Sequence, residues 1–173
     1  MTLPVTPSQT IGPFSHEGWR WACESTASVD TTTPVIIISG VLRDGDGVPI
    51  TDGMLEAWTP SAAGAEQARQ LPGFRRVPSD DSGAFSLALS RSAASSTEPA
   101  AFVTLFARGL LVHQFTAVFL EDDDLERSAI LAQVPAERRA TLIARKTGPG
   151  AYQWDIHMQG AAETAFFDYG GAA

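Results

Sequence analysis

Short runs of alternating apolar and polar residues, separated by turn sequences, constrain the fold of this chain more than any other feature. The run "PVIIISGVLR" (residues 34–43) is rich in β-branched residues and leads into "DGDG" (residues 44–47). The two glycines of that turn accept positive φ angles without steric cost. The next run, "GMLEAW" (residues 53–58), places Met54, Glu56 and Trp58 on one face of an extended chain. Such a sequence predicts short strands joined by tight turns.

The same pattern continues toward the C-terminus. Four further runs are expected to form strands: residues 84–89, 101–107, 111–120 and 151–160. Strands at this spacing, with turn signals between them, predict an all-β fold of the antiparallel β-sandwich type. With 173 residues, no internal repeat and no linker, residues 1–173 are expected to form a single domain.

One segment departs from the strand pattern. Residues 121–124, "EDDD", precede Leu125, Ile130 and Leu131, as in a short helix with a negative N-terminus. A second helical stretch is expected after Pro135, which is favourable at the start of a helix. The sequence therefore predicts a short helical excursion from Asp122 to Ala144.

Charge and cysteine content exclude several classes of function. The net charge is −8, so no basic surface is expected for nucleic acid or for a membrane surface. No run approaches the roughly 20 apolar residues of a membrane span. The single cysteine, Cys23, has no intrachain partner, and the first residues show no features of a secretion signal. These features together predict a cytoplasmic protein.

Motifs for metal or nucleophilic chemistry are sparse. The three histidines do not follow a metal-binding spacing, although a spatial cluster of His113, His157 and a tyrosine stays open at this point. Residues 121–124 offer oxygen atoms but lack the spacing of a calcium loop, so a solvated helix start is the favoured interpretation. No nucleophile elbow or phosphate-binding loop occurs.

The N-terminal stretch is unusual because it has no charged residue before His16. It contains "TPSQTIGPF" (residues 6–14), and other notable stretches are "FARGLL" (residues 106–111), "VPAERRATLIARK" and "YQWDIHMQG". Together these closely resemble the alpha chain of two-chain enzymes in the intradiol ring-cleaving dioxygenase family. The resemblance spans residues 6–168, and it implies a β-sandwich with helical elements.

The resemblance also implies where the metal is held. In that family the beta chain binds a non-haem Fe(III) through two tyrosines and two histidines. The aligned positions here include Glu66, Ala100 and Phe102, and the loop that would carry the second tyrosine, residues 90–100, has no aromatic residue. The resemblance therefore implies that this chain holds no metal and that the partner beta chain holds the Fe(III) cofactor.

The alpha role implied by the resemblance lies in the substrate pocket. Residues 1–20 would form an extended N-terminal arm that contacts the partner chain. Gly12 and Pro13 match the family's pocket-forming pair, and Phe14 stands where a tyrosine is usual. An arm stiffened by prolines loses little conformational entropy when it binds. The alternative is an edge strand that packs on its own domain.

Arg108 matches an alpha-chain arginine near the substrate carboxylate. A guanidinium pairs bidentately with a carboxylate, and protocatechuate carries one opposite its two hydroxyl groups. The alternative is a structural salt bridge to one of the 20 acidic residues. The reaction implied is cleavage of protocatechuate by O₂ to 3-carboxy-cis,cis-muconate.

Two other classes of function remain at this point. One is a stand-alone β-sandwich binding module without a catalytic partner, which would have no need of the uncharged N-terminal stretch. The other is a self-sufficient dioxygenase that uses His113, His157, Tyr152 and Tyr169. The iron content of the isolated chain would separate the second class from the alpha role.

Overall fold

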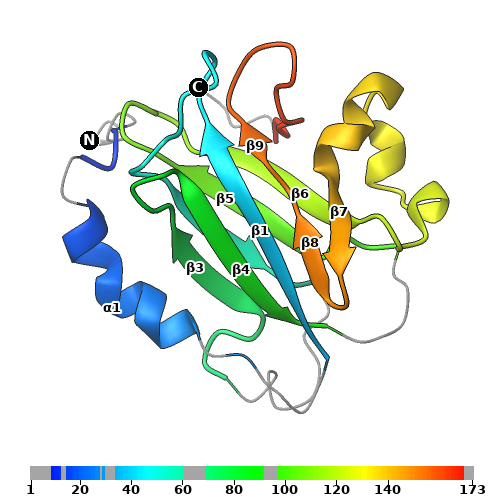
Figure 1. The fold of residues 1–173 in the computed structure, drawn as a ribbon, viewed down its shortest axis with the longest axis horizontal. Helices are drawn as coiled ribbons and strands as arrows, with labels where there is room; N and C mark the ends of the chain where they lie inside the picture. The colour runs from blue at the N-terminus through cyan, green and yellow to red at the C-terminus, as the bar shows by residue number, and fades with distance from the viewer. Residues whose placement is uncertain are drawn as a thin grey trace, which may run out of the picture.

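The computed structural model describes residues 9–12, 15–27, 29, 34–60, 69–91 and 97–169. Two layers of strands face each other, and the helical segments lie at the periphery (Figure 1). The strands are β1 (Val35–Arg43), β2 (Met54–Trp58), β3 (Phe74–Pro78), β4 (Ala84–Ser90), β5 (Ala101–Phe106), β6 (Gln114–Leu120), β7 (Ile143–Gly148), β8 (Ala151–Gln153) and β9 (Ile156–His157). The helices are α1 (Ser15–Ala27), η2 (Leu125–Arg127), η3 (Leu131–Gln133) and η4 (Ala136–Leu142).

The strands follow the order β3-β2-β5-β6-β7-β8-β1-β4, and β9 pairs with β1. The pairs β1–β4, β2–β3, β2–β5, β5–β6 and β7–β8 are antiparallel. The pairs β1–β8, β1–β9 and β6–β7 are parallel. The predicted all-β sandwich is confirmed, with these parallel pairings as an addition that the alternation of residues does not reveal.

Alternation along the strands builds the core. In β4 the apolar residues Phe85, Leu87 and Leu89 are buried, and in β5 every second residue from Ala101 is buried. Each inward-facing side chain on a twisted sheet meets residues from the opposite layer, so one face per strand suffices to form the core. The predicted run 151–160 is divided into β8 and β9, and its alternation persists because Tyr152, Trp154 and Ile156 are buried.

The two ends of the strand order are joined by a buried arginine. Arg75, on β3, is only 2% exposed, and its Nε donates a hydrogen bond to the carbonyl oxygen of Ala88, on β4, at 3.2 Å. On the outside of β3, the backbone N–H of Arg76 donates to Oγ1 of Thr26 in α1 at 3.0 Å. Figure 1 shows α1 alongside β3. A covered edge strand cannot pair with another chain, which is a common protection of β-proteins.

The structure corrects two predicted boundaries, the end of the extended arm and the end of the helical excursion. The arm was expected to be extended over residues 1–20, but α1 begins at Ser15 and includes the last six of those residues. The reason is that the charged residues start at this point, and the segment 15–27 contains no proline. The helical excursion was expected to end at Ala144, but Ile143 and Ala144 belong to β7, where they pair with Phe119 and Leu120 of β6. The excursion itself consists of three short 3₁₀ segments.

In the part of the chain that the structure describes, no helix has both the length and the apolar character that crossing a membrane requires.

Gly40 provides a test of the close packing of β1 against its neighbours in the sheet. A Cβ atom added there would lie 1.8 Å from the carbonyl oxygen of Trp154 and 2.7 Å from the ring of Phe85. Because the first neighbour is backbone, it cannot rotate away, and we expect Gly40→Ala to destabilise the fold by about 3 kcal/mol. The measurement is the melting temperature of the purified protein.

The matched control is Gly18→Ala. Gly18 lies in α1, is exposed and has no atom within 4 Å of an added Cβ. Alanine is favoured over glycine within a helix by roughly 0.5–1 kcal/mol, so this variant should melt at the same or a slightly higher temperature. Equal melting temperatures for both variants would contradict the proposed close approach of β1 to Trp154.

Candidate functional site

The turn between β5 and β6 forms one corner of the sandwich. Ala107 is buried, and the N–H of Leu110 donates to the carbonyl oxygen of Ala107 at 3.2 Å. Gly109, between them, has φ of +92°, a value that residues with a side chain rarely adopt. The turn therefore directs Arg108 and the amide of Gly109 away from the sheet, and both residues are exposed.

The N-terminal segment meets this corner. The N–H of Gly109 donates a hydrogen bond to Oγ1 of Thr10 at 3.1 Å, although 99 positions separate the two residues in the chain. Ile11 and Gly12 follow and are half-buried, and Gly12 has φ of +78°. The structure thus brings the segment of Gly12 to the turn of Arg108. The other two predicted arm residues, Pro13 and Phe14, lie outside the described residues.

Arg108 forms an ion pair with Asp52, which lies between β1 and β2. Its Nε is 2.7 Å from Oδ2 of Asp52, and the two side chains are 62% and 15% exposed. Among the described residues, no hydrogen bond of good geometry reaches this buried carboxylate oxygen, so the ion pair compensates its charge. The isolated chain thus shows an ion pair of the kind that the structural alternative predicts for Arg108, while most of the Arg108 side chain stays exposed.

Sequence reasoning missed two residues of this corner. Thr10 lies within the stretch "TPSQTIGPF", where Gly12, Pro13 and Phe14 were the predicted site residues, and Asp52 lies in the turn "PITDG". No sequence signal pairs either residue with the turn at Arg108, because the contacts depend on the relative positions of distant segments.

A row of aromatic rings runs from the corner along β6. The ring of His113 contacts that of Phe106 in a tilted arrangement, with centroids 5.4 Å apart, and that of Phe115 edge-on at 4.6 Å. Phe115 in turn contacts Tyr169 at 5.1 Å. These tilted and edge-on arrangements are those that aromatic pairs prefer. The row connects the corner to a cavity near the start of β5.

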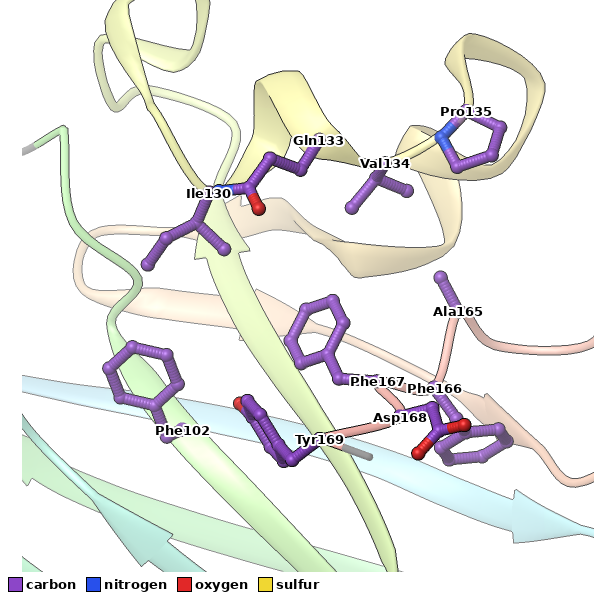
Figure 2. Close-up of a pocket in the computed structure, with 10 residues that line it drawn as sticks. All are labelled: Phe102, Ile130, Gln133, Val134, Pro135, Ala165, Phe166, Phe167, Asp168 and Tyr169. Carbon is purple, nitrogen blue, oxygen red and sulfur yellow. The ribbon is translucent and has the colours of Figure 1, made fainter. Parts of the chain in front are cut away.

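The cavity has a volume of about 550 Å³. Its lining is mostly apolar and consists of Phe102, Ile130, Val134, Pro135, Ala165, Phe166, Phe167 and Tyr169, with the polar residues Gln133 and Asp168. In Figure 2, Phe102 of β5 lies below Ile130 of the helical excursion, and the rings of Tyr169 and Phe167 lie to the right of Phe102. Such a lining suits an apolar group and offers few polar contacts.

The residues present at this cavity do not fit a ferric ion. Phe102, at a position that the resemblance aligns with an iron-binding histidine, presents only a hydrocarbon ring. Ala100, at the other such position, is fully buried, and its N–H donates to the carbonyl oxygen of Val118. In the described part of the chain, no group of three or more His, Cys, Asp and Glu residues is placed to hold a metal. Glu66 lies outside that part.

The proposed ligand set of a self-sufficient dioxygenase is also dispersed. The hydroxyl of Tyr152 donates to Asp122 at 2.9 Å, and Asp122 follows the C-terminal end of β6. His113 precedes the other end of that seven-residue strand, and at about 3.3 Å per residue the two ends of the strand lie roughly 20 Å apart. A single metal therefore cannot bind His113 and Tyr152 together.

The acidic run 121–124 is neutralised by cations rather than arranged around a vacant centre. Four ion pairs involve it: Glu121–Arg145, Asp122–Lys146, Asp123–Arg91 and Asp124–Arg127. The hydrogen bonds from Lys146 and then from Tyr152 lower the pKa of Asp122. These contacts favour a structural role and give no support to calcium binding.

Comparison with known proteins covers nearly the whole chain. In an alignment 197 positions long, the chain is 34% identical to a protocatechuate 3,4-dioxygenase alpha chain from Burkholderia cepacia. The alignment covers 96% of this chain and 98% of that protein. It is 30% identical to a protein of the same description from Pseudomonas putida, with the same coverage. No family model matches the chain.

Solved structures agree on the fold. The dioxygenase domain of a dioxygenase and carbohydrate-binding protein fusion from Streptomyces sp. SirexAA-E superposes with a TM-score of 0.58 at 19% identity, covering 76% of this chain and 85% of that one. A 3-chlorocatechol 1,2-dioxygenase from Rhodococcus opacus 1CP gives a TM-score of 0.56 at 16% identity, covering 91% and 68%. At these identities the likeness shows the fold alone.

The donor atoms at the cavity lead to a prediction about metal content. Because Phe102 and Ala100 supply no ligand, the chain produced alone should contain far less than one iron atom per molecule and should be colourless. Elemental analysis after growth in iron-supplemented medium is the measurement. About one iron atom per chain, with visible absorption, would show that a ligand set exists elsewhere in this chain.

Proposed function

The chain belongs to the protocatechuate 3,4-dioxygenase alpha-chain family of intradiol ring-cleaving dioxygenases, and from this premise we propose that it is the alpha subunit of a hetero-oligomeric enzyme. The beta subunit holds the Fe(III), and the assembled cytoplasmic enzyme cleaves protocatechuate with O₂ to 3-carboxy-cis,cis-muconate. This chain supplies one wall of the substrate pocket.

The main support for the proposal is the contact between the N-terminal segment and the turn at Arg108. The stretch "TPSQTIGPF" and the stretch "FARGLL" are far apart in the chain, yet Thr10 and Gly109 are joined by a hydrogen bond. An arm held at this point extends from the same corner that exposes the guanidinium. Gly12, Pro13 and Phe14 would line the pocket, and the phenylalanine supplies packing without the hydroxyl of the usual tyrosine.

The cavity beside Phe102 supports the division of labour between the subunits. Its apolar lining has no histidine among the described residues, and it fits neither ferric iron nor the charged carboxylate of protocatechuate close to Asp168. This supports the proposal that the oxygen-insertion chemistry takes place in the beta subunit. The contribution of this chain is to orient the substrate and to keep water out.

Assembly gives the first test. When the chain is produced together with its beta subunit, the two should purify as one coloured complex that cleaves protocatechuate, because the iron site and the pocket wall are then present together. Absorbance of the ring-cleavage product and subunit composition are the measurements. A chain that ignores the beta subunit and stays monomeric would support a stand-alone binding module instead.

Arg108→Ala tests recognition of the substrate carboxylate. A charge-assisted hydrogen bond contributes roughly 1.5–3 kcal/mol, so kcat/KM of the complex for protocatechuate should fall by about 10- to 150-fold. Catechol has no carboxylate, so its value should change little. Steady-state kinetics with both substrates is the measurement, and equal losses would make Arg108 a structural residue only.

Two further variants separate recognition from stability. Arg108→Ala leaves the mostly buried carboxylate of Asp52 without its ion pair, whereas adding Asp52→Asn removes that charge. The double variant should keep the selective loss and recover melting temperature. Arg145→Ala is the matched control, since Arg145 is 67% exposed and pairs with Glu121, which follows the far end of β6. It should leave both substrates unaffected.

A further inference from the structure

The hydrogen bond between Thr10 and Gly109 links two segments that the proposed function uses separately. One segment carries Gly12 and the other carries Arg108. The bond is made by the side chain of Thr10, whose Oγ1 accepts from the backbone N–H of Gly109 at 3.1 Å. Both residues are exposed, so the core does not dictate their contact.

The geometry of the turn leaves this amide available. The N–H of Leu110 closes the hairpin turn by donating to the carbonyl oxygen of Ala107. The N–H of Gly109, a residue with φ of +92°, is not used in that bond and has a different acceptor. Thr10 supplies that acceptor. The chain then bends at Gly12, which has φ of +78° and is half-buried. A fixed point therefore stands two residues before the bend.

We propose that Thr10 is a positioning residue, which anchors the N-terminal arm to the β5–β6 turn and thereby sets the place of the pocket wall relative to Arg108. This inference rests on the proposed function, because it assigns the anchor to the same substrate pocket. Gln9 and Thr10 are both exposed, so the anchor does not depend on burial of the arm in the core. Loss of one hydrogen bond should then let the wall shift without unfolding the sandwich.

The test uses the complex with the beta subunit and three variants of this chain. Thr10→Val keeps the shape of the side chain and removes the acceptor, whereas Thr10→Ser keeps the hydroxyl. Thr147→Val is the matched control, since Thr147 is an exposed threonine on β7. Hydrogen–deuterium exchange of the Gly109 amide reports the bond itself, and steady-state kinetics with protocatechuate and catechol report the pocket.

We expect exchange at Gly109 to accelerate by about 2- to 10-fold in Thr10→Val, the factor that the net contribution of one neutral hydrogen bond implies. kcat/KM should fall by a similar factor for both substrates, because a wall serves both. Iron content and melting temperature should stay unchanged, and Thr10→Ser and Thr147→Val should behave as the wild type. The non-selective loss distinguishes this residue from Arg108.

Three results would overturn the inference while leaving the proposed function intact. Unchanged exchange in Thr10→Val would show that the bond is absent from the complex. Faster exchange with unchanged kinetics would show an anchor that does not position the pocket. An equal loss in Thr10→Ser would show that the hydroxyl is not the group that acts. Failure of the wild-type complex to cleave protocatechuate would instead contradict the proposed function and, with it, this inference.

Discussion

The antiparallel pairing of β5 with β6 is the interaction on which the rest of the structure depends. Its register sets Ala101 opposite Val118 and Leu105 opposite Gln114, so one face of the hairpin enters the core. The other face carries the aromatic row from Phe106 to Phe115. The same pairing places the turn of Arg108 at one end of the hairpin and Phe102, which lines the cavity, near the other. A one-residue slip would exchange the two faces and remove both features.

Most of this fold could be predicted from alternation, and the exceptions have physical causes. β1, β2, β4, β5 and β6 follow the predicted runs. In β1, β4 and β5 buried residues alternate with more exposed ones, whereas the second half of β6 is buried on both faces. Alternation says nothing about partners, so the parallel pairing of β7 with β6 was not foreseen. The helix α1 was missed because the uncharged residues before it suggested an extended arm, although its contact with β3 through Thr26 stabilises it. Tertiary contact, more than propensity, decides the conformation of such segments.

The sequence predicted individual residues of the candidate site but not the contacts that bring their segments together. Resemblance supplied Gly12 and Arg108, and the structure places their segments at one corner. The residues that hold the corner together, Thr10 and Asp52, act through contacts between distant segments, for which one sequence carries no signal. Pro13 and Phe14 lie outside the described residues and stay predictions. Phe102 and Ala100, at positions that the resemblance aligns with iron ligands, cannot bind a metal, and the absence of iron from this chain stays a prediction.

The ion pair between Arg108 and Asp52 is compatible with a role in substrate recognition, and the magnitudes explain why. Solvent-exposed ion pairs contribute about 1 kcal/mol or less because water screens them; here the side chain of Arg108 is 62% exposed and that of Asp52 is 15% exposed, so water screens the pair mainly from the arginine side. In the proposed complex, a substrate carboxylate in a pocket closed by the beta subunit would meet less water, and its charge-assisted hydrogen bonds would contribute roughly 1.5–3 kcal/mol. Asp52 contacts Nε of the guanidinium, and the side chain of Arg108 stays mostly exposed, so a second carboxylate can approach it. The weaker interaction can therefore orient the arginine in the free chain without preventing the stronger one.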